Sequence, residues 1–197
     1  MPDFICPNMT DILKSDECLE NFAGLGSYAY AFVKGDLAAP LKRSETNDTN
    51  YVWPTTGAFK AGKGLYKFEL KNHEQGIKGS SRGKRNGFRQ SFEFAFESVN
   101  EAISGTARAL NNLDLGFIVP DPSIEGKFQI MYDPYYDVEF DNDGIQTDTG
   151  KGGDDTRQTT CTATLEPVVH PNFWIAEPES GWDSLLASAV NAQTPNP

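Results

Sequence analysis

The clearest pattern in this chain lies between residues 88 and 119, where the spacing of apolar positions changes from that of a strand to that of a helix and back. From Phe88 to Phe96 every second side chain falls on one face, and polar side chains with one alanine fall on the other. This alternation is typical of a half-buried β-strand. The two predicted faces are Phe88, Gln90, Phe92, Phe94 and Phe96 on one side, and Arg89, Ser91, Glu93, Ala95 and Glu97 on the other.

A helix is expected directly after this strand. Ser98 and Glu101 have the spacing of a capping box, in which each side chain satisfies a free backbone N–H of the first helical turn. Apolar residues at helical spacing follow, and Asn111 and Asn112 are suited to end the helix. We therefore expect a helix from 98 to 112 and an apolar strand from 115 to 119. Because no residue of the passage has an obvious chemical role, it favours a structural or binding function.

Short alternating segments elsewhere predict a mainly β protein. Residues 73–87 are rich in glycine and basic residues and predict a long hairpin or an excursion from the sheet. Asp141-Asn-Asp-Gly144 predicts a turn between two short strands. In the segment 157–166, Cys161, Ala163 and Leu165 are expected to face inward, and Thr160, Thr162 and Thr164 outward. Further strands are expected at 25–34, 57–72 (one or two strands), 128–132, 138–140 and 145–148.

The 197 residues suffice for one domain with arms. The fold class that we expect is mainly β, a sandwich or partial barrel with one flanking helix, an extended loop and terminal arms. The boundaries are an N-terminal arm at 1–24, a core domain at 25–168 and a proline-rich C-terminal arm at 169–197, with a short helix at 182–190. Predicted core residues are Phe92, Phe94, Phe96, Ile103, Leu110, Phe117 and Ile130.

Charge is unevenly distributed along the chain. The net charge is −11, and the first 100 residues are nearly neutral, with 13 basic and 12 acidic side chains. The remainder therefore carries 4 basic and 16 acidic side chains, a net of −12. An acidic surface of this kind keeps a protein soluble or repels a polyanion such as DNA.

Targeting signals and cysteine pairs are not evident. The first residues lack a basic start followed by an apolar stretch, and no segment has the apolar length of a membrane span, so neither secretion nor a membrane is expected. Cys6, Cys18 and Cys161 are an odd number without a CxxC pair. They are interpreted as reduced thiols, with Cys161 a small core residue on a strand.

Two glycine-rich segments resemble nucleotide-binding motifs without meeting their requirements. Residues 57–64 nearly match a phosphate-binding loop, but Gly64 replaces the hydroxyl residue and a strand pattern follows where a helix is needed. Residues 24–29 resemble a dinucleotide fingerprint but lack the preceding apolar strand. Their glycines are better explained by a tight turn or bulge.

Candidates for catalysis or metal binding are weak. The acidic run from Asp133 to Asp155 lacks the closing glutamate of a calcium loop, so turns and a solvated face explain it better. His73 and His170 have no second ligand nearby, which disfavours zinc. No nucleophile, histidine and carboxylate set stands out. We therefore expect no enzyme activity, no cofactor and no metal.

One basic cluster is the strongest candidate for binding. It comprises Lys78, Arg82, Lys84, Arg85 and Arg89. It could contact nucleic acid phosphates, but the interspersed glycines and the lack of interleaved aromatics favour a mobile loop. Because the second half of the chain is strongly acidic, we favour pairing with an acidic surface on a neighbouring copy.

The order of these elements resembles the tail tube proteins of tailed bacteriophages. The resemblance covers about residues 25–168, through FRQSFEFAFESVNEA, LGFIVPD, KFQIMYDP and DGIQTDTGKGGDDTRQTT, which are similar to tail tube sequences of phages that infect Bacteroidetes. In that family a β-sandwich carries one flanking helix. Six copies join their sheets into a ring with an inner β-barrel, and stacked rings conduct DNA.

The resemblance implies a structural virion protein that assembles in the host cytoplasm. Its implied partners are copies of itself within and between rings, the tape-measure, tail terminator and baseplate proteins, and DNA that passes without sequence-specific binding. The loop 73–87 and the terminal arms would join successive rings. We therefore add Trp174 and Trp182 to the basic cluster as expected subunit-interface residues.

Two other functions remain open at this point. One is a different virion protein, such as a head–tail joining or capsid decoration protein with a similar sandwich. The other is a carbohydrate-binding β-sandwich, for which Tyr132, Tyr135 and Tyr136 are the nearest candidate aromatics.

Overall fold

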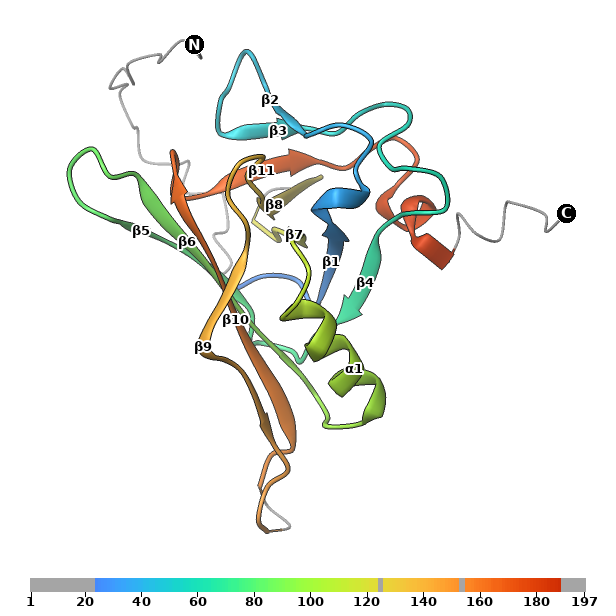
Figure 1. The fold of residues 1–197 in the computed structure, drawn as a ribbon, viewed down its shortest axis with the longest axis vertical. Coiled ribbons are helices and arrows are strands. Elements are labelled where there is room, and N and C mark those ends of the chain that lie inside the picture. Colours follow the sequence, from blue (N-terminus) through green and yellow to red (C-terminus); the bar gives the residue numbers. More distant parts are fainter. Residues whose placement is uncertain (1–23, 124–125, 153–154, 189–197) are drawn as a thin grey trace, which may run out of the picture.

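The computed structural model describes residues 24–123, 126–152 and 155–188. Two β-sheets and the helix α1 make up the fold of these described residues (Figure 1). The mainly β prediction, a sandwich with one flanking helix, is therefore confirmed. The seven-stranded sheet has the order β2 (Lys42–Arg43), β3 (Asn50–Val52), β11 (Phe173–Ala176), β8 (Lys127–Met131), β7 (Leu115–Pro120), β1 (Tyr28–Val33) and β4 (Tyr66–Glu69).

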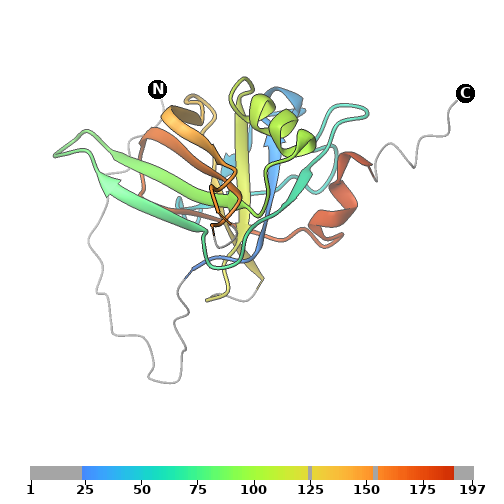
Figure 2. The same cartoon turned by 90° about the horizontal axis from the view of Figure 1, so that it is seen from below.

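The second sheet contains the longest strands and is antiparallel throughout. Its order is β5 (Gly76–Ser81), β6 (Phe88–Phe96), β10 (Gln158–Val168) and β9 (Glu139–Asp148). Figure 2 shows it as a layer beside the seven-stranded sheet. The segment 73–87 thus forms the predicted hairpin, because β5 pairs with β6 along its whole length.

Phenylalanine side chains fill the space between the sheets. Phe92 stacks on Phe94 with 4.7 Å between ring centroids, and Phe117 of β7 lies 5.5 Å and 5.8 Å from these two rings. Cys161 is buried on the same face of the sheet, as predicted. Of the predicted core residues, all are buried except Ile103, which is partly buried against the core.

A second apolar core lies on the other face of the seven-stranded sheet. Strand register places Tyr30, Phe32 and Ile130 on this face, opposite to Phe117. The indole of Trp182 is fully buried there, 5.0 Å from Trp53 and 6.2 Å from Tyr30 between ring centroids. No pattern in the sequence indicated that one sheet would be covered on both faces.

Trp182 was expected in a subunit interface, and that expectation is wrong. It begins the 3₁₀ helix η2 (Trp182–Leu185), whose Asp183 accepts a hydrogen bond of 2.7 Å from the Tyr30 hydroxyl. Strand β11 lies inside the sheet between β3 and β8. Residues 173–186 therefore belong to the body, rather than to an arm. The end of the predicted helix 182–190 and the N-terminal arm fall outside the described residues.

The helix begins at a different cap from the one predicted. Helix α1 spans Glu101–Leu110, and Asn100 is its N-cap, with Asn100 Oδ1 accepting a hydrogen bond of 2.9 Å from the Ile103 N–H. The capping box at Ser98 is therefore wrong, because the chain is still extended at Asn100, with φ −142°. At the other end the predicted stop is correct, since the Asn112 side chain donates to the Arg108 carbonyl.

The segment Asp141 to Gly144 is a bulge within one strand, rather than a turn between two strands. Phe140 pairs with Ala163 and Ile145 pairs with Cys161, so both sides of the segment belong to β9. Asp143 has φ 66°, and a side chain on Gly144 would meet the Asp141 carbonyl at 2.8 Å. These local conformations loop the chain out and return it in the same direction.

Substituting Trp182 tests whether η2 belongs to the core. Trp182→Ala should lower the free energy of unfolding by about 3–5 kcal/mol, because it leaves a large cavity among aromatic rings. Urea unfolding followed by circular dichroism measures this loss. Trp174→Ala is the matched control and should cost less, since Trp174 is only half-buried. Equal small losses in the two variants would show that η2 is a dispensable arm.

The position of the helix cap can be tested with two alanine variants. Asn100→Ala should lower the free energy of unfolding by about 1 kcal/mol, because the Ile103 N–H loses its acceptor. Ser98→Ala should change it less. Thermal unfolding at the same pH measures both changes. A larger loss of unfolding free energy in Ser98→Ala than in Asn100→Ala would show that Ser98 is the helix cap.

Candidate assembly interface

The outer face of the four-stranded sheet is polar along all four strands. The predicted outward row of β6 does point away from the phenylalanine core, and Ser91 and Glu93 are half-buried on it. Ala95 of the same row is buried. On β10 the three threonines face outward as predicted. The Thr164 hydroxyl donates a hydrogen bond of 3.3 Å to the Glu139 carbonyl. Uncharged hydroxyl and methyl groups thus occupy the middle of this face.

Strand register places specific residues in one row across the sheet. Lys78 of β5 is opposite Ser91, Ser91 is opposite Thr164, and Thr164 is opposite Glu139 of β9. Directly opposed residues in antiparallel strands share a face. A lysine therefore stands at one edge of the sheet and a glutamate at the other edge, in the same row.

Both edges of this sheet are unpaired in the described chain, since β5 and β9 are its terminal strands. They differ in charge. Lys78 is exposed on β5, and the adjoining turn carries three more cations. Strand β9 has no cation, and its carboxylates are Glu139, Asp141, Asp143 and Asp148, all exposed. Open strand edges pair readily with other chains, so an edge that is kept long and open favours a partner strand.

The predicted basic cluster is divided by the structure into paired and unpaired groups. Lys78 bonds Glu93 at 2.8 Å, Arg82 lies 3.2 Å from the Glu166 carboxylate, and Arg89 contacts Glu166 with two nitrogens. The contacts with Arg89 and Arg82 hold the pKa of Glu166 below its ordinary value, chiefly through the Arg89 hydrogen bond. Lys84 and Arg85 sit on the exposed turn, and the described residues offer them no salt bridge.

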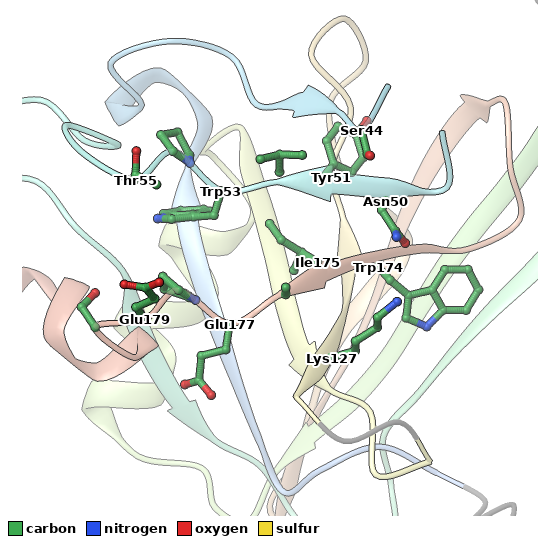
Figure 3. A pocket seen from close by; sticks show the side chains of 15 residues that line it. Ser44, Asn50, Tyr51, Trp53, Thr55, Lys127, Trp174, Ile175, Glu177 and Glu179 are labelled. Atoms are coloured by element: carbon green, nitrogen blue, oxygen red, sulfur yellow. The ribbon is translucent and has the colours of Figure 1, made fainter. Parts of the chain in front are cut away.

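Trp174 lies apart from this cluster, at a cleft lined by the paired strands β3 and β11 and by the segments that follow them (Figure 3). Its indole N–H donates a hydrogen bond of 3.3 Å to the Asp121 carboxylate. The Lys127 side chain of β8 lies beside the indole. The cleft has a volume of about 550 Å³. Glu177 at its far end accepts the Trp182 N–H at 3.3 Å, so this carboxylate organises the loop before η2.

The tyrosines considered for carbohydrate binding are divided as well. Tyr132 is buried, and its hydroxyl accepts a hydrogen bond of 3.2 Å from the Leu41 N–H. Tyr135 is 85% exposed and Tyr136 is 46% exposed, both on the loop between β8 and β9. Asp133 accepts the N–H groups of both and shapes this loop. The three tyrosines therefore form no common groove.

The glycine-rich motifs are explained by packing. A side chain on Gly64 would meet the Leu185 carbonyl at 2.4 Å, and one on Gly26 would meet Pro120 at 2.4 Å. Both glycines thus allow backbone contacts next to β4 and β1. Within the described ranges, no three histidine, cysteine, aspartate or glutamate side chains converge on a point where a metal could bind.

The Cys161 thiol is buried, and its burial raises the thiol pKa to about 12. The thiol therefore stays protonated and unreactive at neutral pH. Cys6 and Cys18 lie outside the described residues.

Comparisons with known proteins identify no relative. No protein-family model, curated protein or solved structure matches this chain. In the part of the chain that the structure describes, no helix has the length and apolar character to cross a membrane.

The basic cluster was predicted from the sequence, but the acidic edge on the other side of the sheet was not. The carboxylates of β9 were interpreted as turns and solvated surface, because the Asp-Asn-Asp-Gly segment concealed a continuous strand. Register across three strand pairs is also needed to place Lys78 and Glu139 in one row, and periodicity alone does not supply it.

The ion pair between Arg89 and Glu166 predicts a pH effect. Because the pKa of Glu166 is lowered in the folded protein, the pair stabilises the fold above the ordinary glutamate pKa. That contribution is lost as the pH falls through the lowered value. In Arg89→Gln the Glu166 pKa should rise toward 4.5, as measured by carboxyl NMR titration. An unchanged pKa would show that the pair does not persist in solution.

Proposed function

We propose that this protein is a tail tube subunit of a bacteriophage, which self-assembles into stacked rings that conduct DNA. The observation that carries the proposal is the four-stranded sheet with two open edges of opposite charge and a polar outer face. The resemblance of residues 25–168 to tail tube proteins supports the same function and suggests six copies in a ring.

Strand direction favours closure of this sheet into a barrel. Because all three strand pairs are antiparallel, β5 and β9 run in opposite directions. Rotation about a common axis keeps the direction of every strand in each copy. The β9 edge of one copy therefore meets the β5 edge of the next in antiparallel orientation, and the alternation continues around the ring. A closed barrel has no remaining strand edge.

The charges at the two edges match across such a contact. Lys78 and Glu139 occupy the same row, so unstaggered neighbours would bring the lysine of one copy opposite the glutamate of the next. The basic turn at 82–85 follows β5 directly and, in this register, would extend toward the residues that precede β9, where Asp137 is exposed. Attraction between these surfaces would guide and orient the association.

The polar face of the sheet would then line the channel. On this face Lys78, Arg82 and Arg89 are outnumbered by the carboxylates Glu93, Glu139, Asp148 and Glu166. A channel with excess negative charge repels the phosphates of DNA, so DNA would slide without being bound. The threonines of β10 fit such a wall because they are polar and carry no charge.

Electron microscopy of the purified protein at high concentration tests the proposal. Hollow tubes and rings are the expected result. A head–tail joining protein would give single rings that do not stack, and a decoration protein or carbohydrate-binding module would give neither form. A strictly monomeric protein, even with its tail partners added, would refute the proposed function.

Charge reversal at the two edges tests the lateral contact. Lys78→Glu and Glu139→Lys should each reduce ring formation at least tenfold, because each places like charges opposite each other. The double variant should recover most of the assembly. Analytical ultracentrifugation at low salt gives the fraction in rings. If the double variant lost as much assembly as the single variants, the Lys78–Glu139 contact would be contradicted.

A further inference from the structure

The cleft beside β3 and β11 arises because these two paired strands separate. Their parallel ladder ends at the pair formed by Tyr51 and Ile175. Each chain then carries a proline, Pro54 in one and Pro178 in the other, and both prolines line the cleft. A proline has no N–H group, so it cannot extend the ladder. The two chains therefore stay apart beyond the paired residues, and the cleft opens between them.

One end of the cleft presents a flat aromatic surface. The Trp174 side chain is half-buried there, and its hydrogen bond to Asp121 fixes the orientation of the indole. The side chains of Asn50 and Lys127 lie beside it in Figure 3, and the described residues give neither of them a hydrogen-bond or ion-pair partner. An indole held in one orientation lets the apolar face of a ligand ring stack on it with little further loss of side-chain freedom.

The other end presents a hydrogen-bond donor next to a carboxylate. Trp53 is only 8% exposed, and within the described residues its indole N–H has no acceptor. In Figure 3 this ring nitrogen is directed toward the side of the cleft that holds Thr55 and Glu179. The Glu179 side chain is exposed and is also unpaired in the described part of the chain. A nearly buried donor of this kind is normally satisfied by a bound group.

The chemistry of both ends narrows the class of ligand. A hydroxyl fits the second end, because it can accept from the Trp53 N–H and donate to the Glu179 carboxylate. The two ends lie roughly 10 Å apart, since Trp53 follows Asn50 by three residues at about 3.3 Å per residue. Glu177 and Glu179 outnumber Lys127, the single cation among the described lining residues, so phosphate and other acidic ligands are disfavoured.

We propose that this cleft binds a short neutral oligosaccharide, with one sugar ring stacked on Trp174 and a hydroxyl of a second ring bonded to Trp53 and Glu179. Sugar rings combine an apolar face with polar edges, which matches an aromatic surface at one end and hydroxyl partners at the other. The site lies apart from the proposed lateral contact, which uses the edges β5 and β9 of the other sheet. The inference goes beyond the proposed function and does not depend on it.

An array of neutral and acidic oligosaccharides tests the inference, followed by calorimetric titration of the neutral oligosaccharide that binds best. Trp174→Ala should weaken binding roughly tenfold or more, because the stacking surface is removed. Glu179→Ala should weaken it roughly fivefold or more, because the hydroxyl loses its acceptor. Glu179 is exposed, so this variant keeps the fold. The matched control is Tyr135→Ala, which removes an exposed aromatic ring outside the cleft and should leave the affinity unchanged.

The outcomes separate this inference from the proposed function. An array on which no neutral oligosaccharide binds, or on which only acidic ones bind, would overturn the cleft site. Unchanged affinity in either Trp174→Ala or Glu179→Ala would overturn it too, as would an equal loss in Tyr135→Ala, since the ligand would then lie elsewhere. These results leave the proposed function intact, because electron microscopy of tubes tests it separately. Sugar binding by a protein that forms neither rings nor tubes would overturn the proposed function and leave the cleft site standing.

Discussion

The alternation of side chains along β6 is the constraint on which the rest of the structure depends. Its phenylalanines fill the space against β7, and its polar residues form the outer face of the same sheet. A slip of one residue would exchange these faces and expose the phenylalanine row. Register is therefore fixed from β6 to β5 and β10, and from β10 to β9. The row from Lys78 to Glu139 exists only because this register is fixed.

The second core explains why the four-stranded sheet is free to use its outer face and edges. Trp182 and Trp53 cover the far side of the seven-stranded sheet, so that sheet is packed on both faces. The four-stranded sheet has one apolar face, which already contacts the first sheet. Its other face is polar and needs no cover within the chain. One layer thus supplies stability, and the other offers the polar face and open edges on which the proposed association depends.

Long alternating segments were predictable from the sequence, and short strands were not. The phenylalanine row of β6 and the Cys161 row of β10 repeat every second residue over enough positions to fix both strand and face. Strands β2, β3 and β11 have two to four residues, too few for a period to be detected, and their position depends on distant partners. Asn100 and Ser98 are equally suited to cap a helix, so backbone conformation decides between them. The acidic edge was missed because Asp141 to Gly144 has turn composition but forms a bulge.

Opposite charge on the two edges also bears on the symmetry of the proposed assembly. A twofold dimer through β5 would bring the Lys78 side chains of the two copies close together near the centre of the strand, and one through β9 would place two rows of carboxylates together. Both arrangements bring like charges into contact, which acts against pairing of identical edges. Pairing of β5 with β9 avoids this repulsion and leaves one free edge of each kind on every oligomer until a ring closes. The charge difference between the edges therefore supports the proposed closed ring over a symmetric dimer.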